Sequence, residues 1–564
     1  MKTKLQLQQE LDRIHRKSYP AYKDLRGQYD FGEYVLSIDH VQGDPFAAPS
    51  NVSVIVPMQK AGFPQKIRSE ESTRVALEDA LLRRFSKHLA EFSFRAKGSG
   101  KSGLLATSRP GPEILRRSAM RISDQAVTAR FEVGFPANGR TINSDQLEKI
   151  LFEFLPIVVR KSIYYKSWNP RDLQKVYELA CDQQFLREQL PERNLIAFLA
   201  QGAILPRASG ISSSPLPHAI PLTVPETLAV EFELPFRGRV RGMGIPEGVT
   251  LIIGGGYHGK STLLQALEQG VYNHVAGDGR EYVITDATAL KLRAEDGRSI
   301  RNLDLSLFIH NLPNGKDTKC FSTADASGST SQAAAVIEGV EAGSRVFLID
   351  EDTSATNFLV RDEFMQKVVH GDKEPITPFC ACIRDLYVKA GISTVLVAGS
   401  SGAFFHLADT VIQMDAYCPK DVKEKVDRLL ADYPLPVFEA EPFALPTENR
   451  MFWGLSSGGA GQRKGDRMKT KVQSTDGFTL NHEKIDLRYV EQLADSEQTA
   501  ALAAMMQYVI GAVRGSVSVK QLADLLETKL KKEGLETFLG GNVRCGCAEP
   551  RRQEIFAMLN RYRG

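Results

Sequence analysis

Apolar and polar positions change their period along the chain, and the change separates an N-terminal region from a central one. Up to about residue 225, helical patterns at 72–89, 143–161 and 169–180 are mixed with short strand-like runs at 52–56 and 126–133. Apolar positions that recur every three to four residues predict helices, whereas strict alternation predicts half-buried strands. The mixture predicts an α+β domain.

The central region, from about 226 to 418, alternates uninterrupted apolar runs with helical patterns. The clearest runs are 250–253, 345–349 and 394–398. Strands that are apolar on both faces and separated by helices are typical of a parallel sheet covered on two sides. We therefore expect an α/β core here.

The changes of pattern predict four regions in all. They are an α+β domain at 1–225, the α/β core at 226–418, a connecting segment at 419–475 with a Gly-rich basic loop, and a mostly helical domain at 476–564. A chain of 564 residues exceeds what one hydrophobic core usually serves, which agrees with several domains.

The amino-acid composition says little about which class of protein this is. Hydrophobic residues make up 42% and charged residues 25%, the net charge is +3, and no apolar run reaches the roughly 18 residues of a membrane span. The N-terminus is a charged amphipathic pattern without an apolar signal core, so we expect a cytoplasmic protein. The pairs Cys380–Cys382 and Cys545–Cys547 are spaced C-x-C, and buried or free thiols explain them better than zinc.

A glycine-rich loop follows the first central strand. The segment GGGYHGKST has the G-x-x-x-x-G-K-[ST] spacing of a P-loop, between a strand and a helical pattern. Glycines let backbone N–H groups approach phosphate, Lys260 would reach the β- and γ-phosphates, and Ser261 would ligate Mg²⁺. The predicted ATP-binding residues are Gly254, Gly255, Gly256, Tyr257, His258, Gly259, Lys260, Ser261 and Thr262.

A similar segment, GSGKSG at 98–103, lacks this context. Five residues before Gly100 stands Arg95 rather than glycine, and the segment is not framed by an apolar strand and a helix. We expect a mobile basic loop there.

Adjacent acids end the second central strand. RVFLIDED places Asp350 where a Walker B aspartate would hold Mg²⁺ and Glu351 where a carboxylate would polarise the attacking water. An exposed acidic turn is the alternative, and the P-loop makes it the weaker one. Catalytic roles are thus predicted for Glu351 and Lys260, and metal ligation for Ser261 and Asp350.

A serine-rich helix start lies between these two motifs. ASGSTSQ at 326–332 resembles the signature loop of ABC ATPases, and TSATN at 353–357 resembles their D-loop. A serine there can cap the helix, whose N-terminus then offers N–H donors to phosphate. The residues expected to contact ATP are Ser327, Gly328, Ser329 and Gln332.

The longer blocks GGGYHGKSTLL, FSTADASGSTSQAA and DEDTSATNF resemble one family, the predicted ATPases of the ABC class, and the resemblance extends over most of the chain. It implies a P-loop core of ABC type and a homodimer in which ATP lies between the P-loop of one copy and the signature of the other. The chain departs from ordinary ABC ATPases at the switch histidine, where TVLVAGSSG has Ser400. The contact to the γ-phosphate stays unassigned: Ser400 or Ser401 could donate one hydrogen bond, and His310 and His406 are weaker candidates.

Two further positions are less defined. Glu295 and Asp296 stand at about the interval of a Q-loop, although a solvated turn explains AEDGRS better. Phe236 precedes the P-loop at a distance suited to stacking on a base, and it could equally belong to the core.

Three basic clusters suggest a polyanionic partner. Such clusters bind phosphate backbones without reading sequence, while solvated surface charge is the alternative for each. Tyr489 or Tyr562 could add stacking. The clusters are Lys97, Lys101, Arg109, Arg116, Arg117 and Arg121; Arg463, Lys464, Arg467, Lys469 and Lys471; and Arg551, Arg552, Arg561 and Arg563.

The hypothesis from the sequence is an ATP-gated clamp on RNA or single strands. Two alternatives stay open. A small-molecule kinase or phosphotransferase would act as a monomer and need an acceptor, and a regulatory ATPase would direct its basic segments to a protein.

Overall fold

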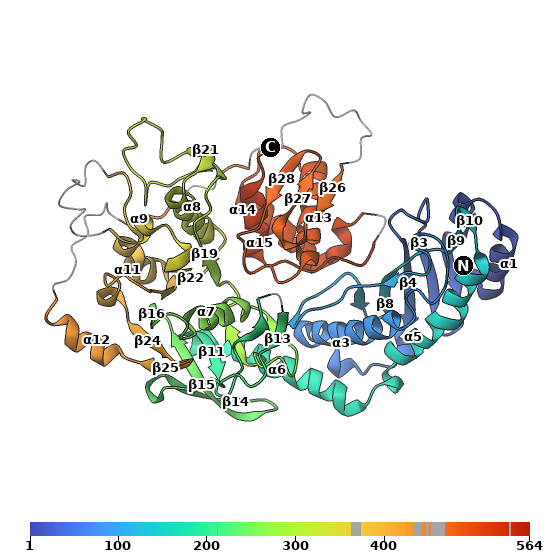
Figure 1. The fold of residues 1–564 in the computed structure, drawn as a ribbon, viewed down its shortest axis with the longest axis horizontal. Helices are drawn as coiled ribbons and strands as arrows, with labels where there is room; N and C mark the ends of the chain where they lie inside the picture. Colours follow the sequence, from blue (N-terminus) through green and yellow to red (C-terminus); the bar gives the residue numbers. More distant parts are fainter. Residues whose placement is uncertain are drawn as a thin grey trace. The chain divides into compact units, whose positions relative to one another are not determined.

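The computed structural model describes the chain except for residues 211, 362–373, 434–442, 447–449, 453–467, 541–542 and 564. It contains two compact units (Figure 1). The first comprises Met1–Cys181 with Leu530–Glu549, and the second comprises Asp182–Lys529 with Pro550–Gly564. The division into 1–225, 226–418, 419–475 and 476–564 stays a prediction.

The first unit is built on a mostly antiparallel sheet in the order β1-β2-β3-β4-β8-β5, with β7 also paired to β8. Residues of β8 alternate between buried and half-buried positions, as expected for a sheet with one face on the core. The strands are β1 (Lys2–Thr3), β2 (Gly27–Asp30), β3 (Val35–His40), β4 (Ser50–Pro57), β5 (Leu105–Ala106), β7 (Met120–Ile122) and β8 (Ala126–Val133).

Helices complete this unit. α1 (Lys4–Ile14) begins with a capping box in which Thr3 and Gln6 satisfy each other's backbone N–H groups. α3 (Glu71–Ala90) packs on α5 (Leu155–Ser162) and against β7. The predicted helix at 143–161 is α4 (Ser144–Glu148), a π-helical segment (Lys149–Phe154) and α5 in succession. α6 (Pro170–Glu192) continues into the second unit.

The second unit contains a six-stranded sheet in the order β19-β22-β23-β16-β24-β25, parallel except for β25. The three buried strands predicted from apolar runs are confirmed, each within one residue of its observed ends. The strands are β16 (Val249–Ile253), β19 (Leu290–Leu292), β22 (Val346–Asp350), β23 (Ser393–Val397), β24 (Thr410–Asp415) and β25 (Cys418–Asp421).

Helices cover this sheet. Buried side chains of α8 (Gly328–Glu341) and α11 (Phe379–Ala390) share one apolar cluster with alternate residues of β16, β22 and β23. α7 (Lys260–Gln269) contacts β22, β23 and also β18 (Val283–Thr285) of a second sheet. That antiparallel sheet has the order β14-β15-β11-β18 and adds β11 (Leu195–Ala200), β14 (Ala229–Leu234) and β15 (Gly238–Pro246). The sequence prediction of a P-loop α/β core is confirmed.

Shorter elements connect these parts. They are α2 (Met58–Ala61), β6 (Glu113–Ile114), β9 (Ala137–Asn138), β10 (Thr141–Ile142), β12 (Arg207–Ser209), β13 (Ser212–Pro215), β17 (Asn273–His274), β20 (Arg298–Leu303), β21 (Phe321–Ala326), α9 (Thr356–Leu359) and α12 (Lys423–Leu430).

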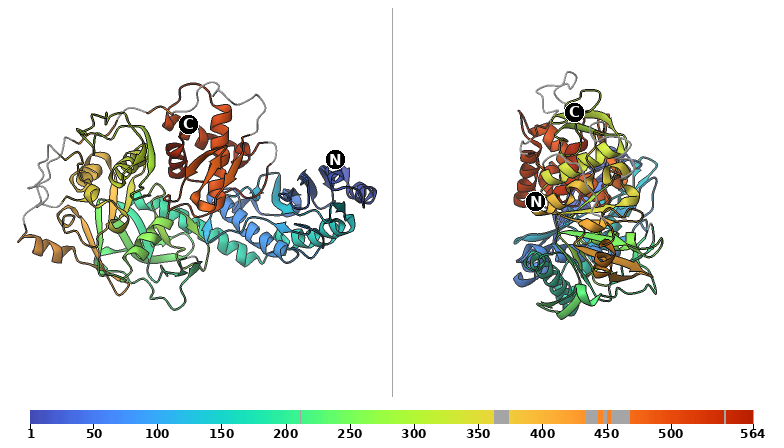
Figure 2. Two further views of the ribbon diagram at one scale, coloured as in Figure 1. Left: turned by 45° about the horizontal axis from the view of Figure 1, so that its top comes forward. Right: turned by 90° about the vertical axis from the view of Figure 1, so that its left-hand side faces the viewer.

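The C-terminal part combines three helices with a small sheet that the sequence pattern did not indicate. α13 (Ser496–Ala512) and α15 (Arg552–Arg561) pack on β26 (Thr470–Val472), β27 (Gly477–Leu480) and β28 (Glu483–Asp486), and α14 (Val519–Glu533) lies beside them (Figures 1 and 2). A mostly helical C-terminal region is confirmed.

The buried side chain of Gln492 joins this part to the α/β core. Its amide donates to the carbonyl oxygens of Glu268 in α7 and Ala289, and its carbonyl oxygen accepts from the Lys291 amide of β19. Because these bonds hold the end of the P-loop helix, the core and the C-terminal helices belong to one folded unit.

Candidate active site

The P-loop joins the carboxyl end of β16 to the N-terminus of α7. Gly259, the residue before α7, has φ +97°. Gly254 has φ +143°, and a Cβ there would lie 2.4 Å from the Met414 carbonyl oxygen. Both positions therefore require glycine. The Lys260 ammonium donates to the carbonyl oxygens of Gly254 (2.7 Å) and Gly255 (3.0 Å).

The turn after β24 supports the loop from outside. The Ala416 amide donates to Nδ1 of His258 at 3.0 Å, and the Tyr417 amide donates to the His258 carbonyl oxygen at 3.1 Å. The predicted site residue His258 thus holds the loop in shape. Tyr257 beside it is 98% exposed, so its ring is open to a partner.

The donors gathered at this end of the sheet fit a phosphate and a hard cation. Glycine amides and the start of α7 are suited to phosphate oxygens. The Ser261 hydroxyl in the first turn of α7 and the Asp350 carboxylate at the end of β22 are oxygen ligands, which Mg²⁺ prefers. These positions agree with the predicted binding of ATP and Mg²⁺, and the binding roles stay predictions.

Asp350 and Glu351 differ in their surroundings. Asp350 is buried, and loss of hydration raises the pKa of its carboxyl group, while the Asp352 amide donates to it at 3.2 Å. Burial alone would raise the pKa of Glu351 as well, but hydrogen bonds from the Ser400 and Gly399 loop outweigh it and hold the pKa below its usual value.

The loop after β23 forms a three-donor cradle around Glu351. Oε2 accepts from the amides of Gly399 (2.6 Å) and Ser400 (3.0 Å), and Oε1 accepts from the Ser400 hydroxyl (2.7 Å). Ser400, expected at the place of a switch histidine, therefore contacts the carboxylate predicted to act on water. Its contact with ATP stays a prediction.

Ser327 caps the signature helix α8, as predicted for a serine in this segment. Its hydroxyl accepts from the Thr330 amide at 3.4 Å, and its backbone is extended. The helix begins at Gly328, inside the ASGSTSQ segment. Ser327 is exposed and Gly328 half-buried, so the helix start lies at the surface.

Two signature residues point inward instead. Gln332 is fully buried, donating to the Ser354 hydroxyl at 2.8 Å and accepting from the Ala355 amide at 2.9 Å. Ser329 donates to Asn357 Oδ1 at 2.5 Å. Both side chains thus hold the D-loop. Their direct contact with ATP stays a prediction.

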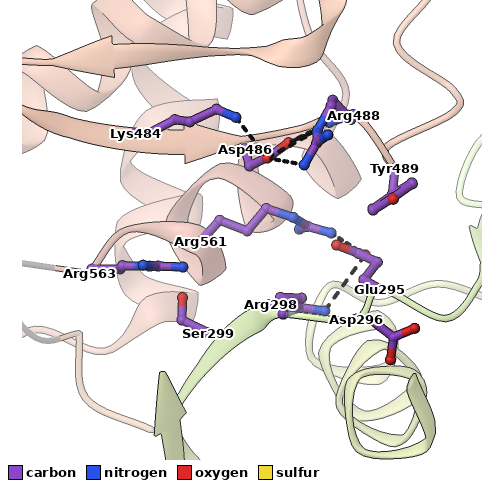
Figure 3. A pocket seen from close by; sticks show the side chains of 11 residues that line it. Glu295, Asp296, Arg298, Ser299, Lys484, Asp486, Arg488, Tyr489, Arg561 and Arg563 are labelled. Atoms are coloured by element: carbon purple, nitrogen blue, oxygen red, sulfur yellow. Dashed lines mark hydrogen bonds and ion pairs between the residues drawn. The ribbon is translucent and has the colours of Figure 1, made fainter. Parts of the chain in front are cut away.

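The proposed solvated turn AEDGRS is confirmed at Asp296 and Gly297, which are exposed, but Glu295 is buried, which corrects the interpretation for that residue. Glu295 is buried beside Arg561 of α15 (2.5 Å) and Arg298, and its amide donates to Ser331 of α8 at 2.8 Å. Figure 3 shows Arg561 and Arg298 directed to this carboxylate in a cavity of about 90 Å³. The signature helix is therefore connected to the C-terminal helix, which sequence spacing could not indicate.

Several arginines of the basic clusters are engaged inside the fold, which corrects their reading as phosphate-binding surface. Arg116 is buried between Glu71 and Glu549, and Arg117 is buried too. Arg551 pairs with Glu554, and Arg552 pairs with Asp524 and Glu527. Arg463, Lys464 and Arg467 lie outside the described residues.

The remaining candidates lie in ordinary structural contacts or at the surface. His310 bonds the Thr377 hydroxyl at 2.7 Å, Tyr562 stacks on Phe452, and Arg293 lies 4.5 Å over Tyr489. Phe236 is 41% exposed between β14 and β15, and its stacking on a base stays a prediction.

The C-x-C cysteines of α11 are buried thiols. Burial raises the pKa of both Cys380 and Cys382 to about 12, so they are protonated at neutral pH.

Among the helices that the structure describes, none combines the length and the apolar character needed to cross a bilayer.

Three family models match the chain. A P-loop domain model of ABC ATPases matches residues 169–444, a model described as "ATPase of the ABC class N-terminal" matches 4–166, and one described as "MRB1590 C-terminal domain" matches 469–564.

One curated protein shares part of its sequence with this chain. "Uncharacterized protein MJ1628" of Methanocaldococcus jannaschii is 34% identical over 188 residues, which are 32% of this chain and 42% of that protein. The match therefore spans less than half of the relative's length.

Similar solved structures include an ATP-binding cassette of an ABC transporter, MJ1267, in its ADP conformation (13% identity, TM-score 0.24, 37% of this chain and 94% of that one). Another is cbiO1 from Clostridium perfringens (14%, 0.28, 42% and 92%).

Proposed function

Because the chain belongs to the ATPases of the ABC class, and is thus an ATP hydrolase, we propose that it hydrolyses ATP at two sites shared between two copies. The observation that carries the proposal is the order β22-β23-β16 in the main sheet. The carboxyl ends of these adjacent parallel strands bring the P-loop, Asp350, Glu351 and Ser400 to one edge, where ligands of open α/β sheets bind.

Each residue has a distinct task in this proposal. The amides of 254–259 and Lys260 bind the phosphates, and Ser261 and Asp350 hold Mg²⁺, which neutralises phosphate charge when bound. Glu351 accepts a proton from the attacking water. Ser400, with the Gly399 amide, orients the Glu351 carboxylate, since their three hydrogen bonds fix both of its oxygens.

The second half of the site comes from the partner. Ser327 and the amides at the start of α8 lie at the surface, where the positive helix end can face a γ-phosphate bound to another copy. ADP lacks that phosphate, so ATP stabilises the dimer more than ADP does. Gln332 and Ser329 contribute by holding the D-loop in place.

The mass of the Glu351→Gln variant tests the dimer. With Mg²⁺ and ATP, this variant should sediment at twice the chain mass, whereas with ADP it should sediment as a single chain. A second variant, Ser327→Glu in the Glu351→Gln background, places a negative charge against the phosphate and should stay monomeric. A single-chain mass for Glu351→Gln at saturating ATP would refute the proposal.

We further propose that hydrolysis gates a clamp on single-stranded nucleic acid. The basic residues that stay at the surface support it, among them Lys97, Arg109 and Arg563. Oligonucleotide binding over a salt series tests this part, because each neutralised phosphate adds to the salt dependence. Absence of binding at low salt would reject it while leaving the ATPase proposal intact.

The two rival functions give different readouts. A small-molecule kinase predicts turnover that depends on an added acceptor and is indifferent to Ser327→Glu. A regulatory ATPase acting on a protein predicts ATP-dependent dimerisation without oligonucleotide binding. The buried link from α8 through Glu295 to α15 suits the clamp and the regulatory ATPase alike, since either must transmit the nucleotide state to other parts of the chain.

A further inference from the structure

The glycine-rich segment 98–103 of the first unit is a tightly bonded loop, contrary to the mobile loop expected from its sequence. The Ser99 amide donates to the Ala137 carbonyl oxygen at 2.7 Å, and the Lys101 amide donates to the Pro45 carbonyl oxygen at 2.9 Å. Gly103 has φ +78°, and a Cβ there would lie 2.0 Å from the Ala96 carbonyl oxygen. The loop is therefore fixed against three neighbouring segments.

Two exposed phenylalanines flank this loop. Phe46 is 62% and Phe94 is 52% exposed. A Cβ on Gly100 would lie 2.9 Å from the Phe46 ring, and the Phe94 amide donates to the Gly103 carbonyl oxygen at 2.7 Å. Large apolar rings left in water on a rigid support are typical of a binding surface.

The backbone of Phe94 strengthens this interpretation. Its φ is +59°, a left-handed conformation that is unfavourable for a bulky residue without functional or structural cause. The bond from its amide to Gly103 holds the residue in this conformation, and the ring stays outside the core. The fold thus maintains an unfavourable backbone while exposing an aromatic ring.

Cationic side chains surround the two rings. Arg95 and Lys97 are exposed neighbours of Phe94, and Lys101 is half-buried within the loop. Asp44, next to Phe46 in space through its bond to the Phe46 amide, is paired with the exposed Arg140 at 2.7 Å. The surface therefore combines flat apolar rings with an excess of positive charge.

We propose that Phe46, Phe94, Arg95, Lys97 and Lys101 form a platform for unpaired nucleotides of a single strand. The rings stack on bases, and the cations contact the flanking phosphates. A duplex would keep its bases stacked on each other and leave the rings without a partner. This inference rests on the nucleic-acid part of the proposed function, and it names the surface where the strand binds.

Anisotropy of a labelled 20-nucleotide oligo(U) and of a matched duplex, measured with the full-length protein over a salt series, tests the platform. Phe46→Ala combined with Phe94→Asn removes both rings, and asparagine tolerates the left-handed backbone at 94. Binding to the single strand should weaken at least about fivefold. The slope of affinity against salt should stay unchanged, whereas Lys97→Gln should reduce that slope by about one.

Two controls separate stacking from unfolding. Phe46→Trp retains an aromatic ring and should bind the single strand at least as well as the natural protein. Tyr433→Ala removes another aromatic side chain, which is 67% exposed in the second unit, and should change nothing. Circular dichroism and ATP turnover should be unchanged in all of these variants.

The outcomes are distinct. If the natural protein binds no oligonucleotide, the nucleic-acid part of the proposed function fails and the platform with it. If it binds, but the double variant binds equally well, the platform alone is overturned. Equal loss of single-strand and duplex binding in the double variant would also contradict stacking on unpaired bases.

Discussion

Two glycine-rich, lysine-containing loops of this chain have similar sequences and different surroundings. The loop 254–259 follows a buried parallel strand and leads directly into α7, which is the context that a phosphate-binding loop requires. The loop 98–103 bonds to Ala137 and Pro45 and turns back on itself. The flanking elements, rather than glycine and lysine content, therefore decide whether such a loop can hold a phosphate.

The largest effect is expected from a substitution of Glu351, beside the loop 254–259. Glu351→Gln removes the proton acceptor, so ATP turnover should fall by about 10²- to 10⁴-fold. The neighbouring Asp352→Asn, outside the Ser400 cradle, should stay within a few-fold of the natural rate. Steady-state phosphate release measures both, and equal rates for the two variants would remove Glu351 from its role.

The glycines of the two loops sharpen the comparison. Gly103→Ala should destabilise the first unit by about 3 kcal/mol or more, because its φ is positive and the new Cβ meets a carbonyl oxygen. Gly256→Ala in the P-loop meets open space and should leave thermal unfolding unchanged. Calorimetry compares them, and an unaffected Gly103→Ala would mean that the loop 98–103 is not held as described.

A buried glutamate of the first unit makes its stability depend on pH. Burial raises the pKa of Glu78 in α3 to about 7, although the Ile122 amide and the charges of Arg74, Arg116 and Arg121 oppose it. The unfolded chain ionises first, so stability should fall as pH rises from about 4.5 to 7, by about 3 kcal/mol in total.

Glu78→Gln cannot ionise, and its unfolding free energy should lose that slope. Urea titrations at pH 5 and pH 7.5 measure the difference between the two proteins. If the natural protein and the variant show the same slope of unfolding free energy against pH, Glu78 is not the group that titrates.

The smallest effect concerns the cradle. Ser400→Ala removes one of three donors to Glu351 and should lower the maximal turnover about fivefold without changing the ATP concentration at half-maximal rate. Ser400→Thr should restore it. Ser401→Ala is the matched control, since the Ser401 hydroxyl accepts only a local bond from the Ala403 amide at 3.3 Å among those described. Equal effects of the two alanine variants would contradict a specific contact.

The strands and the P-loop of the core could be predicted because each depends on a short continuous stretch of sequence. Apolar runs located β16, β22 and β23, and the P-loop spacing located the turn into α7. The signature segment was placed correctly at a helix start, but the inward direction of Gln332 depends on the D-loop folding over it.

Contacts between residues far apart in the sequence explain which predictions failed. Arg561 and Glu295 are 266 residues apart, and Arg116 and Glu549 come from opposite ends of the chain, so charges that looked like surface clusters are ion pairs of the interior. Loop 98–103 was misjudged for the same reason, since its rigidity depends on contacts with Pro45 and Ala137.

Mixing two inactive chains tests the shared site most directly. Lys260→Ala disables a P-loop, and Ser327→Glu disables a signature, so neither variant alone can form an intact site. A mixed dimer has one, so an equimolar mixture should recover about one quarter of the natural ATPase rate when the chains pair at random, and more when the variants do not pair with themselves. If the mixture is no more active than its components, ATP is not bound between two chains.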